Sequence, residues 1–293
     1  MRDIAKSAAR GLLQASGLTA GIRYWNRNGV RIIMYHRFPA QSGLEAQCEH
    51  LKKHYRPLSL TEVSESLARR KPLPRGTVVI TVDDGYRDLL LNAWPIFKAS
   101  SIPVLVYVAT DLPDHHTWLW TDQLRHFLSQ EGDSTTTVER LKRVPDDERR
   151  TYLASLTGMQ ANPPPEYAPL TWDEIRALAK EGAEFGAHTR THPILSRLPN
   201  RDRMREEIAG SKARLEKELG SPVLHFCYPN GTPDDYNAEV VDMVRECGFR
   251  TAVTAVRGIN FAGADPFLLR RLHQEPTRHV SAFAHQVAGL YRQ

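Results

Sequence analysis

Two short stretches of the sequence gather side chains that can do acid–base or metal chemistry. Asp83 and Asp84 directly follow the β-branched run 77–82, and His188 and His192 lie four residues apart later in the chain. Two imidazoles and one carboxylate form a three-ligand metal set that leaves positions open for water and substrate. An isolated pair of acids before a glycine is more often a turn, so the prediction of a catalytic site depends on the two stretches meeting in space.

The geometry of strands and turns sets expectations for these four residues. Neighbouring side chains of a strand point to opposite faces, so Asp83 and Asp84 are expected to have different partners. Ligands of parallel sheets collect beyond the carboxyl ends of the strands, where both acids lie. A spacing of four places His188 and His192 on one side of a helical turn, although Pro193 favours a turn at the edge for the second.

Composition limits the class of protein. The chain has 293 residues, of which 41% are hydrophobic and 25% charged, as is ordinary for a globular protein that buries a sizeable core. The net charge of +5 is spread along the chain, so no nucleic-acid partner is indicated. The three cysteines form no C-x-x-C pair and lie outside both stretches, which excludes a closed thiolate zinc site and favours a reducing compartment.

Short apolar runs alternate with helical patterns along most of the chain, which is typical of an α/β fold with a parallel sheet. About seven strands are predicted, over residues 30–36, 77–82, 103–109, 183–187, 223–227, 250–255 and 267–272. Residues 111–170 break this rhythm and are predicted to be a helical insertion over the mouth of a barrel. Trp118 and Trp120 lead into the insertion and either stack on a sugar ring or, as is more common for a single tryptophan, pack in the core.

Residues 1–29 are predicted to form a helical N-terminal extension, and residues 30–293 a single domain. The first twenty residues hold no apolar segment long enough for a signal peptide or a membrane span. Apolar residues recur there at helical spacing among basic ones: Ile4, Ala8, Leu12, Ala15 and Leu18. Such a helix packs on its own domain or makes a peripheral contact with a membrane. We therefore expect a cytoplasmic protein or one at the inner face of the membrane.

Three motifs carry a resemblance to a known family. Residues 81–85 (TVDDG), 188–192 (HTRTH) and 226–231 (FCYPNG) together resemble the motifs of the polysaccharide deacetylases, the NodB-homology or family 4 carbohydrate esterases. The third motif has the F-x-Y-P-x-G form of one branch of that family. The resemblance runs from about residue 30 to residue 272. It implies a distorted (β/α)7 barrel, in agreement with the number of strands predicted above.

The resemblance also implies an activity and a set of roles. The reaction would be hydrolysis of an N-acetyl, or in some members an O-acetyl, group on a polysaccharide or lipid-linked glycan. Asp84, His188 and His192 would hold a divalent metal, usually zinc, and Asp83 would be the general base. The remaining positions would be the backbone N–H of Asn230 as oxyanion donor, Gly231 as room for the substrate, and His36 and Tyr228 as substrate contacts.

The sequence departs from the family pattern in three ways. The arginine that usually opens the third motif and orients the base is replaced by Cys227, and Arg271 near the end of the last strand is the predicted substitute. The usual fourth motif, an aspartate followed by a tryptophan, is not recognisable. The fifth motif is matched only loosely by Leu272 and His273, so the general acid is unassigned.

Two other functions remain open from the sequence. The same scaffold suits a small-molecule amide deacylase, which a closed pocket would favour over an open, aromatic-lined mouth. A non-catalytic glycan-binding domain would explain the missing motifs. The second carboxylate at Asp83 counts against mere binding, because holding an ion and a sugar does not require it.

Overall fold

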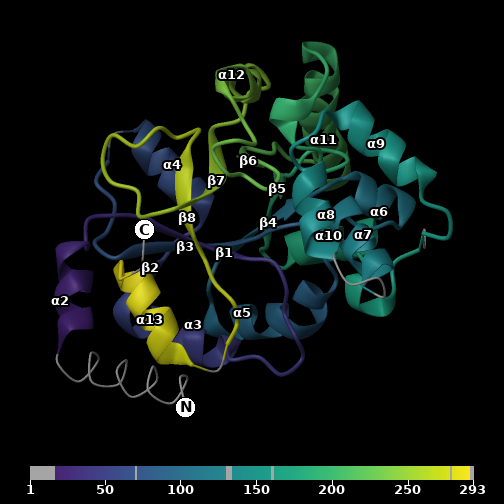
Figure 1. Cartoon of the computed structure of the whole chain (residues 1–293). Helices are drawn as coiled ribbons and strands as arrows, with labels where there is room; N and C mark the ends of the chain where they lie inside the picture. The colour runs from purple at the N-terminus through teal and green to yellow at the C-terminus, as the bar shows by residue number, and fades with distance from the viewer. Residues whose placement is uncertain (1–16, 70, 130–133, 160–161, 278, 291–293) are drawn as a thin grey trace.

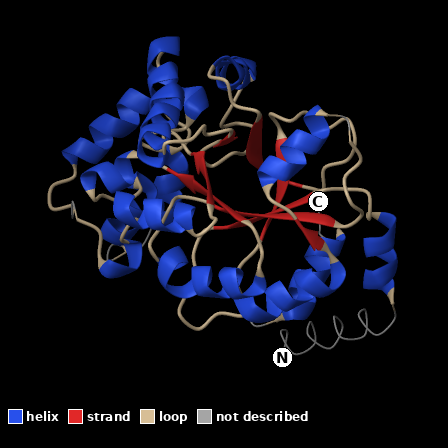
Figure 2. Cartoon of the chain, turned by 180° about the vertical axis from the view of Figure 1, so that it is seen from behind, coloured by secondary structure: helices blue, strands red, loops and turns tan. Residues whose placement is uncertain are grey.

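The computed structural model describes residues 17–69, 71–129, 134–159, 162–277 and 279–290. Its centre is a closed barrel of seven parallel strands, which confirms the predicted fold (Figures 1 and 2). The strands are β1 (Arg31–Tyr35), β3 (Thr77–Val82), β4 (Val104–Val108), β5 (Glu184–Ala187), β6 (His225–Cys227), β7 (Thr251–Arg257) and β8 (Leu269–His273). They follow one another around the barrel in the order β1-β8-β7-β6-β5-β4-β3, and pairing of β1 with β3 closes it. The two-residue β2 (Arg56–Pro57) adds to β3.

Strand β3 shows why this sequence makes a barrel strand. All six residues are buried, because alternate side chains serve two cores. Val79 packs inside the barrel with residues of the other strands, whereas Val78, Ile80 and Val82 pack beneath the surrounding helices. The alternation of side chains between the two faces continues beyond the strand, so Asp83 points to the same inner side as Val79.

Helices surround the barrel, as Figure 2 shows from behind. Those outside the predicted insertion are α3 (Leu44–His54), α4 (Leu60–Ala68), α5 (Trp94–Ser100), α10 (Trp172–Lys180), α11 (Arg201–Leu219), α12 (Ala238–Glu246) and α13 (Val280–Ala288). The capping box predicted at Thr171 is present at the start of α10. The predicted cap of α4 was wrong by two residues, because Ser59 rather than Thr61 forms the capping box with Glu62.

Between β4 and α10 the chain forms α6 (Asp111–His115), α7 (Trp120–Leu128), α8 (Ser134–Leu141), α9 (Asp146–Ser155) and the turn η2 (Pro165–Tyr167). These helices gather on one side of the barrel (Figure 1) and enclose a small core of their own. They lie beside the carboxyl ends of β4 and β5. The chain therefore places additional side chains around one end of the barrel, where the acids of β3 also lie.

The N-terminal part begins with α2 (Leu18–Trp25), which packs against α13 (Figure 1). Most of the predicted amphipathic pattern, at positions 4, 8, 12 and 15, lies outside the described residues. No helix in the described ranges is long and apolar enough to cross a membrane. The division of the chain at residue 29 stays a prediction.

Candidate active site

A cavity of about 480 Å³ opens at the carboxyl ends of the barrel strands. The predicted site residues come to it from different strands, and all eight line it: His36, Asp83, Asp84, His188, His192, Tyr228, Asn230 and Arg271. Helix α7 and the turn η2 add Trp120, Asp122 and Tyr167 to the wall, and Lys142 joins it directly after α8. The two stretches singled out in the sequence thus meet in one cavity.

Asp84, His188 and His192 converge on one point. The Oδ1 atom of Asp84 lies 3.4 Å from His188 Nε2 and 3.7 Å from His192 Nε2, and the two Nε2 atoms are 3.2 Å apart. Ligands bound to one zinc ion at about 2.0–2.2 Å in a tetrahedral arrangement are separated by about 3.3–3.6 Å. The donor atoms have the spacing of a shared metal ligand set, and all three residues are buried.

Hydrogen bonding at His188 makes this set suitable for a cation. His188 Nδ1 lies 2.8 Å from the carbonyl oxygen of Cys227, to which only an N–H can donate. In the neutral imidazole, Nε2 then carries a lone pair that points at the Asp84 carboxylate and at His192. A nitrogen lone pair that faces a carboxylate oxygen is repelled by it unless a proton or a cation lies between them. An imidazole held by a carbonyl through its other nitrogen is the usual arrangement of metal-binding histidines.

The pKa values of the three groups reflect the same crowding. Burial opposes ionisation of Asp84, but the His188 hydrogen bond and the nearby imidazoles outweigh burial and lower its pKa. Burial and the neighbouring His188 lower the pKa of His192 to about 3. Burial also disfavours a charged His188, but contacts with Cys227 and Asp84 outweigh it and raise its pKa. The two imidazoles shift in opposite directions because both cannot hold a proton at this separation.

A second group of donors, Asp83, His188 and Cys227, is also close enough to surround an ion. It suits a metal less well. Both oxygens of Asp83 already accept hydrogen bonds from Arg271, and burial raises the pKa of the Cys227 thiol, which favours its protonated form. The His188 nitrogen on this side is the one bonded to the Cys227 carbonyl. Of the two groups, we therefore favour the one with Asp84.

Asp83 is held by a bidentate ion pair with Arg271. Nη1 lies 2.7 Å from Oδ1 and Nη2 lies 2.8 Å from Oδ2, and both residues are only 2% exposed. Burial alone would raise the pKa of Asp83, but the guanidinium outweighs burial and lowers it. Arg271 is itself fixed by donation from Nε to the carbonyl of Thr254. Asp83 and Asp84 thus have separate partners, as the strand geometry predicted.

Cys227 lies against this ion pair, contrary to the expectation that no cysteine belongs to the clusters. Its Sγ is 3.2 Å from Arg271 Nη2 and 3.5 Å from Asp83 Oδ2. The strand β6 brings it there from far along the sequence, which the local pattern could not reveal. Its small side chain leaves room for the guanidinium that enters from β8.

The stretch 188–192 is a loop and not a helical turn, in agreement with the effect expected of Pro193 on the second histidine. Thr189 and His192 have φ values of 65° and 57°, a left-handed backbone that is uncommon for residues other than glycine and strained for β-branched Thr189. Asp84 and Asn230 share this conformation, with φ of 75° and 58°. Such residues persist only where the surrounding contacts hold them, and they often cluster at functional sites.

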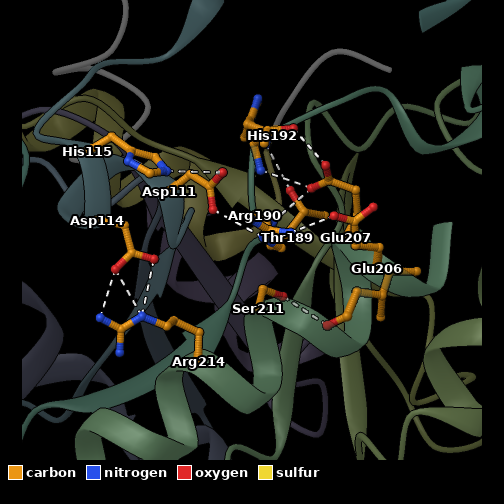
Figure 3. Close-up of polar contacts among 12 residues, drawn as sticks. Asp111, Asp114, His115, Thr189, Arg190, His192, Glu206, Glu207, Ser211 and Arg214 are labelled. Carbon is orange, nitrogen blue, oxygen red and sulfur yellow. Dashed lines mark hydrogen bonds and ion pairs between the residues drawn. The ribbon is translucent and has the colours of Figure 1, made fainter. Parts of the chain in front are cut away.

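Glu207 of α11 holds this loop from below, and it was missed in the sequence (Figure 3). Its fully buried carboxylate accepts hydrogen bonds from the backbone N–H groups of Arg190 and Thr191, at 2.9 Å each, and from the Thr191 hydroxyl at 2.8 Å. Arg203, one turn before it on the helix, pairs with the same carboxylate at 3.0 Å. Position 207 falls in the buried stripe of α11, beside Met204 and Ile208. A carboxylate among these apolar positions was the signal in the sequence that could have indicated a buried role for Glu207.

The insertion holds the same loop from the other side. Trp120 of α7 donates from Nε1 to the carbonyl of His192 at 3.1 Å. Its ring lines the cavity but is only 8% exposed, and Arg149 of α9 stacks on it at 4.7 Å. Trp118 packs on Tyr167 and His126 instead of entering the cavity wall.

Asn230 and Gly231 form a tight turn at the end of β6. The side chain of Asn230 donates to Asp235, and within the described residues its backbone N–H has no hydrogen-bond acceptor. Gly231 has φ of 66°, and a Cβ there would meet the backbone nitrogen of Ala255 at 2.8 Å. The neighbouring strand thus already requires a glycine here, and its predicted role in leaving room for the substrate stays a prediction.

The two rim histidines differ in their surroundings. His36 Nε2 lies 3.8 Å from Asp83 Oδ2, whereas His273 Nε2 pairs with Glu275 at 3.3 Å. Their rings meet edge to face at 5.4 Å. Both line the cavity.

Tyr228 also lines the cavity, but its side chain does not suit the predicted role of substrate contact. Its hydroxyl donates to the carbonyl of Phe267, its ring stacks on Tyr236, and the residue is 1% exposed. The Tyr228 side chain packs in the core, which corrects its predicted role as a substrate contact.

A closed seven-stranded parallel barrel with an acidic and histidine-rich cavity at the strand ends places the chain among the α/β barrels that carry their active sites at the carboxyl ends of the strands. Comparison with known proteins identifies the group within that class. Residues 70–252 match the family model for polysaccharide deacetylase, which is more than half of the chain, so the chain belongs to the polysaccharide deacetylase family. Members of this family are hydrolases that act on N-acetyl amide bonds of polysaccharides.

Individual relatives are distant. The putative polysaccharide deacetylase YxkH of Bacillus subtilis is 20% identical over 267 residues, which cover 88% of this chain and 76% of that protein. The poly-β-1,6-N-acetyl-D-glucosamine N-deacetylase of Escherichia coli strain K12 is 30% identical over 93 residues, 28% of this chain and 14% of that enzyme.

Solved structures share the fold. IcaB from Ammonifex degensii superposes with a TM-score of 0.64 at 21% identity and covers 90% of this chain and 97% of its own. The Streptococcus pyogenes deacetylase PplD, solved in complex with acetate, gives 0.62 at 21% identity and covers 87% and 97%.

Proposed function

We propose that the protein is a metal-dependent deacetylase that removes N-acetyl groups from a glycan polymer, and that the same chemistry extends to O-acetyl groups. The convergence of Asp84, His188 and His192 beside a separately held Asp83 carries the proposal. The three residues would hold one divalent cation, and the nitrogen-rich donor set suits zinc. Such a cation supplies Lewis acidity, which polarises an amide carbonyl and makes an attacking water more acidic.

Asp83 is the general base in this proposal. Its carboxylate is not needed to complete the ligand set, and the Arg271 ion pair keeps it ionised and correctly oriented while it accepts a proton from the attacking water. Arg271 acts through Asp83 and is therefore a positioning residue. A domain that only binds glycans has no use for a buried ion pair built around a second aspartate, and this disfavours the non-catalytic alternative.

Two further groups would act on the substrate. The backbone N–H of Asn230 faces no acceptor among the described residues and is available to the amide oxygen as negative charge develops there. His36 is the better placed proton donor for the leaving amine, because its Nε2 lies near Asp83 while His273 pairs with Glu275. This differs from the role first predicted for His36, which was contact with the substrate and not catalysis.

The substrate proposed is an N-acetylated polysaccharide. Trp120 and Tyr167 belong to the wall of the cavity, and the family to which the chain belongs acts on polysaccharides, which favours a sugar chain over a small amide. The Escherichia coli relative acts on poly-β-1,6-N-acetyl-D-glucosamine according to its name. An N-acetylglucosamine polymer is therefore the first substrate to test.

The test is acetate release from N-acetylglucosamine oligomers by the zinc-loaded protein, compared with Asp83→Asn. We expect release by the wild type and a loss of roughly 100-fold or more in the variant, because the base is removed while the ligand set is kept. A small N-acetylated amide tested in parallel separates the alternative deacylase. Absence of acetate from every acetylated sugar tested, together with tight glycan binding, would favour the non-catalytic reading.

A further inference from the structure

The end of the molecule opposite the active site carries a cationic and aromatic surface that the proposed reaction does not use. It surrounds a cavity of about 290 Å³ near the amino ends of β1 and β3. We define this basic–aromatic surface by Arg23, Tyr24, Trp25, Arg27, His54 and Arg75. The surface lies where α2 meets the barrel, on the far side of the molecule from α6–α9 (Figure 1).

Among the described residues, no acid neutralises the positive charge of this surface. Three arginines and one histidine line the cavity without any carboxylate, and none of the three arginines forms an ion pair in the described part of the chain. Arg27 stacks on the Tyr24 ring at 3.9 Å and donates from Nη1 to the backbone carbonyl of Tyr24. The Nε atom of Arg27 is buried and has no hydrogen-bond partner among the described residues. Burial lowers the pKa of His54, and the charges of Arg23 and Lys53 lower it further.

Two aromatic side chains project beside these cations. Trp25 is 83% exposed and Tyr24 is 65% exposed, the largest values among the large hydrophobic residues of the described chain. Tryptophan and tyrosine favour the boundary between lipid headgroups and acyl chains, and basic side chains beside them bind anionic lipids. An exposed indole is costly in water but finds a favourable place at such a boundary.

We propose that the basic–aromatic surface docks the protein peripherally on a membrane that contains anionic phospholipids. The arginines contact lipid phosphates, and Trp25 enters the interfacial layer. The partner is a lipid surface rather than a nucleic acid, because the two exposed aromatics lie together at the end of the short helix α2, beside the cations, instead of lining a groove that could follow a nucleic-acid strand.

Docking through the basic–aromatic surface would fix the orientation of the active-site cavity relative to the membrane. Arg75 precedes β3 and Asp83 follows it, and a six-residue strand spans roughly 20 Å at about 3.3 Å per residue. The cavity with Asp83 therefore faces away from the lipid surface. The enzyme would deacetylate a glycan on the aqueous side, not a sugar next to its lipid anchor.

The experiment is cosedimentation of the full chain with vesicles of phosphatidylcholine alone or of phosphatidylcholine and phosphatidylglycerol in equal parts. We expect binding only to the anionic vesicles, and loss of that binding at high salt. Each neutralised arginine is expected to lower the partition coefficient about five-fold, so Arg23→Gln with Arg75→Gln lowers it about 25-fold. Trp25→Ala is also expected to lower it several-fold.

Matched controls are Arg205→Gln, an exposed arginine on α11, and Leu91→Ala, an exposed apolar residue elsewhere. Both are expected to bind like the wild type. Equal binding to neutral vesicles, no binding at all, or variants that bind as well as the wild type would overturn the proposal; the last result would place binding in another segment. Competition by a soluble polyanion without any vesicle binding would also contradict it. Acetate release is independent of these results, so this inference and the proposed activity can fail separately.

Discussion

Arg271 and Asp83 form a bidentate ion pair inside the barrel, between strands that are almost 190 residues apart in sequence. Its two short contacts, at 2.7 and 2.8 Å, fix the carboxylate next to the candidate metal ligands. Replacing the arginine leaves a buried carboxylate without its counter-charge, and this is the first prediction.

Arg271→Met is expected to lower the free energy of unfolding by about 3–5 kcal/mol, because one partner of a buried pair is lost. Arg271→Lys keeps the charge but loses the two-pronged contact, so acetate release should fall while the fold is better retained. Urea denaturation and acetate release measure the two effects. Arg270→Met, an exposed neighbour on the same strand, is the control. Wild-type activity in Arg271→Lys would contradict the positioning role.

Glu207 is expected to set metal affinity through the loop that carries both histidines. Glu207→Ala removes the acceptor for two backbone N–H groups and should weaken zinc binding about 10–100-fold. Glu207→Gln keeps one acceptor oxygen and should fall between the alanine variant and the wild type. Competition with a chromophoric chelator measures the dissociation constant, and saturating zinc should restore much of the activity.

The control for this prediction is Glu206→Gln, because Glu206 is half-exposed and pairs with the side chains of Arg190 and Arg203 but accepts nothing from the backbone of the loop in the described residues. It should bind zinc like the wild type. If Glu207→Ala kept wild-type zinc affinity and lost only thermal stability, the carboxylate would be structural and unrelated to the ligand loop.

His36 and His273 are distinguished by their effect on turnover. His36→Gln should lower kcat by roughly 100-fold or more, because the donor to the leaving amine is lost. His273→Gln should have a smaller effect, since its imidazole pairs with Glu275 at the rim. Zinc content should be unchanged in both variants. A larger loss of kcat in His273→Gln would reverse the assignment.

His225 makes stability depend on pH at the other end of the barrel. Burial lowers its pKa to about 3 from an ordinary value of 6.5, and its ring lies between Thr61 and Thr251. Between about pH 3 and pH 6.5, His225 therefore binds a proton in the unfolded chain but not in the folded chain. Its contribution to stability is complete above about pH 6.5 and is lost as the pH falls toward 3, by about 1.4 kcal/mol per pH unit.

The comparison that isolates this effect uses His225→Gln, which cannot take up a proton. Between about pH 7 and about pH 5, the wild type should lose about 2 kcal/mol more of its unfolding free energy than the variant. Urea denaturation at both pH values provides the measurement. Parallel losses in the two proteins would show that other groups govern the pH dependence.

The barrel could be predicted because each strand carries a strong local signal. The run 77–82 is β-branched and uninterrupted, and the capping box at Thr171 defines the start of α10. The start of α4 was less certain, because Ser59 and Thr61 are both good caps and only the contact with Glu62 decides between them.

The parts of the site that were not predicted depend on contacts between distant segments. Glu207 belongs to α11, and only the folded chain brings it under the loop after β5. Cys227 and Arg271 meet because β6 and β8 are both barrel strands. Tyr228 stands in a functional motif, yet the curvature of the chain turns its ring into the core. Sequence order cannot show which way a side chain turns at the end of a strand.

The most direct test of the account is the position of the metal. Crystals of the zinc-loaded protein, measured by anomalous diffraction at the zinc edge, should show one ion at about 2.0–2.2 Å from Asp84 Oδ1, His188 Nε2 and His192 Nε2. Asp83 should remain paired with Arg271 and outside the coordination sphere. An ion bound instead by Asp83, His188 and Cys227, or no ion between Asp84 and the two histidines, would contradict the central claim.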